Sequence, residues 1–264
     1  GFRSVVRTDI LQFVFMFTGF ILLLVFAWNL NDTPLSLKPS LPERYFDPTG
    51  GNSIQYILVW FFIAMWTFID PGFYQRTAAA SSPGTAKKGI LISIFFWFIF
   101  DILTVTTGLY AVALFPNQEA AMAYPELALR ILPPFVYGIF LVGLFSTIMS
   151  TIDSNGLISA ITFGRDILLR IQQKDEQGNE TQYIRKGLIV MAIIAVLLAL
   201  SIPSVVQLWY VIGSIIVPGI LLPFLMTFTQ TRLNNGKIIP TMILPVIVAI
   251  FWFLYGHFSG HYPM

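Results

Sequence analysis

The sequence predicts an all-α polytopic membrane protein with seven transmembrane helices. Three observations carry this prediction. Of the 264 residues, 56% are hydrophobic and only 11% are charged, whereas an average soluble domain is about 25% charged. Seven apolar stretches approach the roughly 20 residues that a helix needs to cross a bilayer. Segments that are rich in Lys and Arg alternate along the chain with segments that are poor in them, as expected if seven spans place successive segments on opposite sides of the membrane.

Composition also excludes several classes of protein. The net charge of +2 is too small to indicate a nucleic-acid partner. With no Cys, disulfide scaffolds, thiolate metal sites and Cys nucleophiles are excluded. No Ser-His-Asp arrangement, phosphate-binding loop or metalloprotease motif occurs in the sequence. We therefore expect no enzyme activity, with the lipid bilayer as the first partner.

The expected spans begin and end where apolar runs meet polar or turn-forming residues. In chain order they are 10–28, 54–69, 90–115, 135–161, 187–202, 206–228 and 239–255. The second span is short and can be extended only through Asp70, Pro71 and Gly72. Pro218 and Gly219 lie inside the sixth span and predict a kink or an opening there. Residues 31–53 read as an external loop and 166–185 as a solvated cytoplasmic connector.

The basic residues also predict the orientation. Three of the 15 Lys and Arg residues, Lys38, Arg44 and Arg130, lie in one set of segments, and the other twelve lie in the alternate set. Because positive residues favour the cytoplasmic side, we expect the N-terminal end to be cytoplasmic and the C-terminal end external. The expected location is the plasma (inner) membrane.

The fourth span carries the densest polarity at bilayer depth. Thr147, Ser150, Thr151 and Ser154 recur at helical spacing and share one face, with Asp153 beside it. Hydroxyls and a carboxylate offer hard oxygen ligands, which suit a small cation such as Na⁺. Alternatively, each hydroxyl bonds its own helix or a neighbouring one. The density of polar residues favours the ion site.

Other polar residues in or near the spans allow two interpretations each. Asp101, in the middle of the third span, is either a functional carboxylate or a structural hydrogen-bond partner. Composition alone favours Asp9 as a helix cap or a solvated charge. Asp70 marks either a broken helix that exposes backbone to a ligand or an ordinary helix end. Trp66 and Tyr210 could contact a substrate, although most membrane aromatics serve packing.

Three stretches resemble the sodium/solute symporter family, which includes sodium/glucose and sodium/proline symporters. They are TDILQ at 8–12, QRTAAA at 75–80 and MSTIDS at 149–154, the last running on to Gly164, Arg165 and Asp166. Each stretch alone is short, but all three occur in the family's order on the predicted spans. The resemblance covers nearly the whole chain.

The resemblance implies a fold and a boundary. The family's fold resembles that of the bacterial leucine transporter, with two inverted repeats of five helices each. On that pattern the first six spans match core helices 5–10, and the last span is a peripheral helix. Residues 1–264 are then a single transmembrane transporter domain, a fragment that lacks the N-terminal core helices. The start at Gly1 without an initiator Met agrees with this expectation.

The resemblance also implies roles for individual residues. Thr147, Ser150 and Thr151 match the family's sodium site. Asp9, Asp153 and Ser154 match a second ion site or ion path, at which Asp153 replaces a residue that often bears a hydroxyl. That replacement either strengthens ion binding or turns the site toward protons. Substrate-pocket candidates are Trp66, Asp101 and Tyr210.

The function implied is sodium-coupled secondary active transport, or symport, of a small organic solute or anion by alternating access. Na⁺ is the coupling ion, and no other metal and no cofactor are expected. Alternatives are a symporter-like sensor domain of a signalling protein, proton-coupled transport, and a channel or structural membrane subunit.

Overall fold

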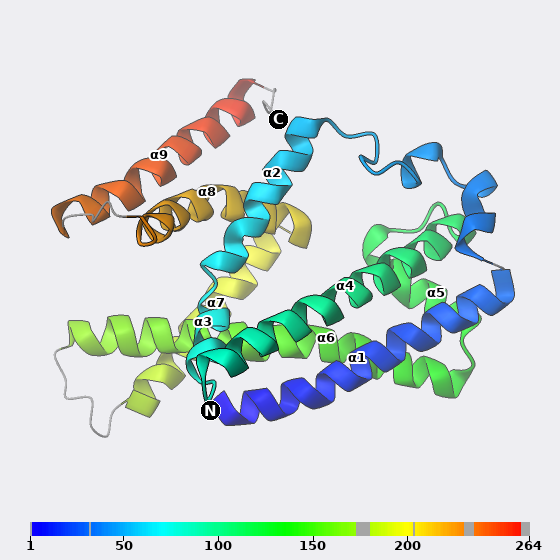
Figure 1. Cartoon of the computed structure of the whole chain (residues 1–264), viewed down its shortest axis with the longest axis horizontal. Helices are drawn as coiled ribbons and strands as arrows, with labels where there is room; N and C mark the ends of the chain where they lie inside the picture. The colour runs from blue at the N-terminus through cyan, green and yellow to red at the C-terminus, as the bar shows by residue number, and fades with distance from the viewer. Residues whose placement is uncertain (1, 32, 173–179, 203, 230–234, 260–264) are drawn as a thin grey trace. The chain divides into compact units, whose positions relative to one another are not determined.

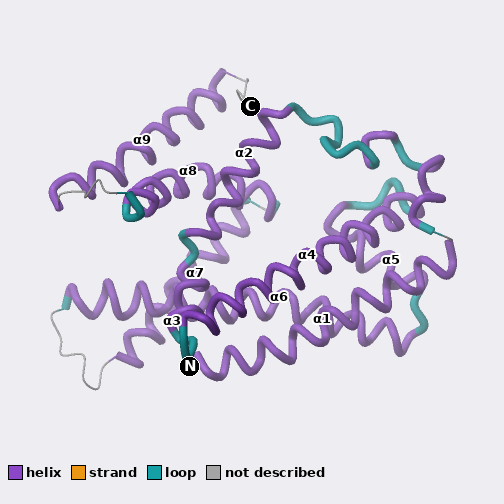
Figure 2. Tube along the Cα trace, viewed as in Figure 1, coloured by secondary structure: helices purple, strands orange, loops and turns teal. Residues whose placement is uncertain are grey.

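The structure, a computed structural model, describes residues 2–31, 33–172, 180–202, 204–229 and 235–259. Helices and loops account for all of these residues, without a strand among them (Figure 2). The longer helices are α1 (Phe2–Asn31), α2 (Ile54–Ala64), α3 (Pro71–Ala78), α4 (Pro83–Leu114), α5 (Ala123–Ile131), α6 (Pro134–Ile161), α7 (Glu180–Ser201), α8 (Val205–Met226) and α9 (Asn235–Ser259).

Shorter elements lie between these helices. Four are 3₁₀ helices: η1 (Pro34–Ser40), η2 (Glu43–Tyr45), η3 (Met65–Phe68) and η4 (Ala120–Met122). The fifth, η5 (Thr162–Leu169), is a π-helix that continues α6 without a loop. The connector expected at 166–185 therefore begins as helix, and its residues 173–179 lie outside the described part.

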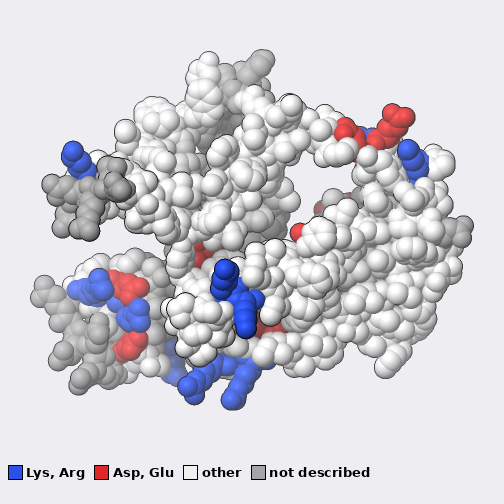
Figure 3. Space-filling model, in the orientation of Figure 1, with Lys and Arg blue, Asp and Glu red and all other residues white. Residues whose placement is uncertain are grey.

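Seven helical segments among the described residues are long and apolar enough to cross a membrane, which confirms the predicted number. Large apolar side chains remain exposed along them, and Figure 3 shows broad surfaces without charged side chains. In water such a surface would be unfavourable, whereas lipid accepts it. The fifth span is longer than predicted, since α7 begins at Glu180 and includes charged residues before its apolar part.

The sequence singled out two places where a span could be interrupted, and the structure shows a break at one of them. The second span is broken: α2 ends at Ala64, η3 follows, and α3 begins at Pro71, a position that proline tolerates because no donor is needed there. The sixth span carried the alternatives of a kink or an opening: α8 continues as a helix through Pro218 and Gly219, so the opening is wrong, and the kink stays a prediction. A side chain at Gly219 would lie 2.8 Å from the carbonyl oxygen of Met242, so α9 packs directly on this part of α8.

The chain divides into two compact units. The first comprises Gly1–Gly50 and Arg76–Met191, and the second comprises Gly51–Gln75 and Ala192–Met264. In the first unit, α1 lies along α6 and α4 (Figure 1). The rings of Phe13 and Phe17 on α1 meet that of Phe96 on α4 at centroid distances of 5.2 and 5.8 Å. Phe20 and Phe140 belong to the buried core of this unit.

The second unit is built around α8. This helix packs against α9 and against the segment formed by α2 and η3. Its buried core contains Ile69, Val217 and Leu221, with Trp66 packed beside them. The broken span thus supplies one wall of this core.

Candidate functional site

The site in the first unit depends on a close approach of α1 and α6. A Cβ atom at Gly143 would lie 2.6 Å from the carbonyl oxygen of Phe15, and one at Gly19 would lie 3.3 Å from the Cα of Phe140. Only glycine lets the two backbones come this near. The polar residues Asp9 and Ser150 lie two turns further along the same pair of helices and meet there.

Four side chains form what we call the Asp9 cluster: Asp9, Arg76, Ser150 and Ser154. The hydroxyl of Ser150 donates to Oδ1 of Asp9 at 2.9 Å. Nη2 of Arg76 donates to Oδ2 of Asp9 at 3.0 Å and to Oγ of Ser154 at 2.8 Å. Both oxygens of the carboxylate therefore have donors. The cluster joins α1, α3 and α6. Within its ion pair the side chain of Asp9 is 21% exposed and that of Arg76 is 41% exposed.

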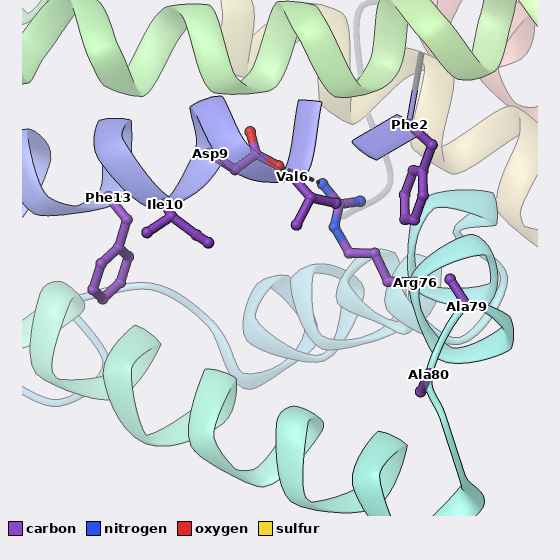
Figure 4. Close-up of a pocket in the computed structure, with 8 residues that line it drawn as sticks. All are labelled: Phe2, Val6, Asp9, Ile10, Phe13, Arg76, Ala79 and Ala80. Carbon is purple, nitrogen blue, oxygen red and sulfur yellow. Dashed lines mark hydrogen bonds and ion pairs between the residues drawn. The ribbon is translucent and has the colours of Figure 1, made fainter. Parts of the chain in front are cut away.

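The cluster borders an open pocket of about 470 Å³ (Figure 4). Its lining comes from α1, from the end of α3 and from the two residues after it, and it is apolar except for the ion pair: Phe2, Val6, Asp9, Ile10, Phe13, Arg76, Ala79 and Ala80. In Figure 4 the Arg76 side chain extends from α3 to Asp9. The ion pair thus provides the polar part of an apolar pocket.

The hydroxyl face of α6 splits into two kinds of residue. Ser150 and Ser154 bond groups on other helices, as described above. Thr147 donates to the carbonyl of Gly143, and Thr151 donates to the carbonyl of Thr147, each at 3.1 Å. The two threonines therefore bond the backbone of their own helix, which was the alternative to an ion site. A hydroxyl that donates a hydrogen bond still keeps lone pairs that can bind a cation.

Two further polar residues lie near the cluster in sequence. Asp153 is half-buried on α6, and no bond to its carboxylate occurs among the described residues. Gln12 is one turn after Asp9 on the same face of α1 and is only 7% exposed. Its amide oxygen has no hydrogen-bond partner in the described part of the chain. A buried acceptor without a donor is rare and marks a position that a ligand or water could fill.

Sequence reasoning did not assign Arg76 and Gln12 to the site. Both stand in the stretches that resemble the symporters, so the signal was available. Arg76 was counted only as a cytoplasmic charge, because nothing local in the sequence links it to Asp9, 67 residues earlier.

The substrate-pocket candidates divide between the two units. Asp101 belongs to the first unit and is exposed on α4. In the second unit, the indole nitrogen of Trp66 donates to Oδ2 of Asp70 at 3.2 Å. The ring of Tyr210 lies 5.7 Å from that of Trp60, between centroids. Trp66 and Tyr210 therefore lie on elements that pack together, α2–η3 and α8.

No group of three or more His, Cys, Asp or Glu side chains that could hold a metal occurs among the described residues. An ion at the predicted position would depend on hydroxyl and carbonyl oxygens with one or two carboxylates. That donor set suits Na⁺ better than a transition metal.

Comparison with known proteins identifies the family of the chain. A family model described as the sodium:solute symporter family matches residues 1–244. The sodium/pantothenate symporter of Haemophilus influenzae is 27% identical over 217 residues, which cover 78% of this chain and 45% of the relative. The osmoregulated proline transporter of Bacillus subtilis is 26% identical over 274 residues, covering 97% and 54%.

A eukaryotic relative is also similar. The high-affinity choline transporter 1 of Drosophila melanogaster is 25% identical over 241 residues, covering 82% of this chain and 37% of the relative. The chain spans about half the length of the curated relatives it matches.

Proposed function

The chain belongs to the sodium:solute symporter family, and from this premise we propose that the protein carries a small organic solute across the plasma membrane together with Na⁺. The Asp9 cluster is the observation that supports this most directly. It brings the carboxylate of Asp9 on α1 together with two hydroxyls of α6 on apolar spans, where polar groups are costly and mark ion pathways.

In this proposal the residues have separate roles. Thr147, Ser150 and Thr151 contribute to the sodium site. Asp9, Asp153 and Ser154 form a second ion site or the path by which the ion leaves. Trp66, Asp101 and Tyr210 contribute to the solute pocket.

The proposed coupling is thermodynamic and needs no covalent chemistry. Na⁺ and the solute both bind the same one of two conformations more tightly. Binding of either therefore raises the affinity of the protein for the other ligand. A rocking motion of the helical bundle then opens the pocket to the other side, as in inverted-repeat transporters. The chain contributes core helices 5–10 and one peripheral helix of a single transporter domain. Its N-terminal end is cytoplasmic.

The relatives' names guide the choice of solute. They specify pantothenate, proline and choline, so these three compounds begin the screen. Ile63, at a position where sugar-carrying symporters place Asn, cannot bond a sugar hydroxyl and argues against a hexose.

The test uses the full-length protein in proteoliposomes. Uptake of each labelled solute is measured with an inward Na⁺ gradient, with K⁺ in place of Na⁺, and with a proton gradient alone. We expect Na⁺-dependent uptake that Ser150→Ala with Thr151→Ala abolishes. Ser159→Ala is the matched control, because nine residues place Ser159 on the opposite side of α6 from Ser150.

Other results contradict the proposal in specific ways. Uptake driven by the proton gradient alone indicates proton coupling. Solute binding without uptake indicates a sensor. Uptake that stays equally Na⁺-dependent in the double variant shows that the sodium site is assigned to the wrong residues.

A further inference from the structure

We propose that Arg76 is a tethered cation that competes with Na⁺ for Asp9 and thereby promotes release of the ion. This inference rests on the proposed function, because it concerns the ion path of a sodium-coupled transporter. It adds a residue to which neither the sequence nor the comparisons give a role.

The contacts of Arg76 carry the argument. Its Nη2 lies 3.0 Å from Asp9 and 2.8 Å from Ser154, and Ser150 donates to the other carboxylate oxygen. Three oxygen-bearing side chains of the Asp9 cluster, those of Asp9, Ser150 and Ser154, are therefore already gathered around a cation. That cation is the guanidinium group, which bonds two of the three directly.

Two cations at one carboxylate repel each other. Like charges about 4 Å apart repel by roughly 4 kcal/mol at the effective dielectric constant of a protein surface. In the proposal an Na⁺ ion that binds Asp9 therefore displaces Arg76, and Arg76 displaces Na⁺ when it returns. The exchange keeps the net charge of the cluster constant, so neither state leaves Asp9 uncompensated in the membrane.

The position of Arg76 allows such an exchange. It is the more exposed partner, at 41% of its side chain, and it lies near the end of the eight-residue helix α3, beside an open pocket. Its long side chain can swing into this pocket without disturbing the buried packing of α1 on α6. Asp9 and Ser150, by contrast, are fixed by the close contact at Gly143.

Arg76 should therefore lower the affinity for Na⁺ and raise the rate at which Na⁺ is released. Without the competing cation, Na⁺ should bind more tightly and leave more slowly. A residue that merely held the fold together would instead weaken Na⁺ binding when removed.

The experiment compares wild type, Arg76→Gln, Arg76→Lys and Arg7→Gln in the full-length protein. Arg7 is an exposed cation two residues before Asp9, so Arg7→Gln removes the same charge nearby as a matched control. Three quantities are measured: the Na⁺ concentration for half-maximal uptake, the maximal uptake rate, and direct binding of radioactive ²²Na⁺ to purified protein.

For Arg76→Gln we expect the half-saturating Na⁺ concentration to fall about threefold or more, as loss of a half-exposed ionic competitor predicts. The ²²Na⁺ binding constant should fall in parallel, and the maximal uptake rate should fall as well. Arg76→Lys, which keeps the charge, should resemble wild type, and so should Arg7→Gln. Size-exclusion profiles and melting temperatures verify that each variant is folded. If Arg76→Gln misfolds, Arg76→Lys is compared with wild type instead. An increase in the half-saturating Na⁺ concentration of Arg76→Lys contradicts the inference.

Unchanged or weaker Na⁺ binding in a folded Arg76→Gln protein overturns the inference. An equal shift in Arg7→Gln also overturns it, since the effect is then one of general surface charge. In both cases wild type still shows Na⁺-dependent uptake. Failure of the proposed function differs, because wild type itself then lacks Na⁺-dependent uptake and ²²Na⁺ binding.

Discussion

Two carboxylates, Asp9 in the first unit and Asp70 in the second, have opposite kinds of partners. Asp9 is bonded by Arg76 and Ser150, which are 67 and 141 residues away in the chain. Asp70 is bonded by Trp66, four residues before it, and by the backbone N–H of Gly72, two residues after it. One carboxylate joins three helices, and the other shapes a single break in a helix.

We infer that this difference separates the two binding steps of the proposed transport. A change at Asp9 alters contacts among α1, α3 and α6, where the proposal places the ion. A change at Asp70 alters the start of α3 and the position of the Trp66 indole, where the proposal places the solute. Four substitutions test this separation.

Asp9→Asn should have the largest effect. It removes the anion of the cluster and leaves Arg76 without its charge partner. Because a charge pair at this distance is worth about 4 kcal/mol before screening by solvent, we expect uptake at low Na⁺ concentration to fall about 100-fold. Initial rates in proteoliposomes over a range of Na⁺ concentrations give the measurement. Asp70→Asn is the matched control, and an equal loss of Na⁺ affinity in both variants would contradict the separation.

Gly143→Ala should break the cluster without touching a polar residue. The new methyl group would lie 2.6 Å from the carbonyl oxygen of Phe15, so α1 must move away from α6. Overpacking of this kind costs about 2 kcal/mol. We expect a lower melting temperature and weaker Na⁺ binding. Gly138→Ala is the control on the same helix, because nothing lies within 4 Å of its added Cβ. If both variants melt alike, the close approach does not support the site.

Asp70→Ala should affect the solute rather than the ion. The carboxylate caps α3 through the N–H of Gly72 at 2.6 Å and holds the Trp66 indole. Loss of such a cap costs about 1 kcal/mol, which corresponds to roughly fivefold in an equilibrium constant. We expect the half-saturating solute concentration to rise by this factor while the half-saturating Na⁺ concentration stays at the wild-type value. A shift in Na⁺ alone would show that Asp70 belongs to the ion step.

Gln12→Leu should have the smallest effect. Its buried amide oxygen lacks a partner among the described residues, so an apolar replacement should leave the melting temperature unchanged or raise it. If the oxygen serves the ion path, the half-saturating Na⁺ concentration rises about threefold, the value of one neutral polar contact. Ser214 in the second unit has the other buried side-chain oxygen that lacks a partner in the described part, and Ser214→Ala should not change the Na⁺ dependence. A lower melting temperature for Gln12→Leu would indicate a structural role.

Much of the fold could be predicted from local pattern. Apolar length predicted the seven spans, and Asp70 with Pro71 predicted the broken second span. The opening expected at Pro218 and Gly219 is absent: α8 remains a helix there, and α9 packs against it. Local pattern also placed the start of α7 too late, since charged residues before an apolar run can still be helical.

The candidate site divides in the same way. Asp9, expected at the start of the first span, lies inside α1, which begins at Phe2. The sequence alone places the hydroxyls on one face of α6, because helical spacing is a property of neighbouring residues. It could not decide which hydroxyls bond their own helix and which reach another. Only the tertiary structure decided that Ser150 and Ser154 face Asp9 and Arg76 while Thr147 and Thr151 turn back to their helix. The reason is that these partners depend on how closely two backbones approach at Gly19 and Gly143, and residues so far apart in the chain meet only when the helices pack.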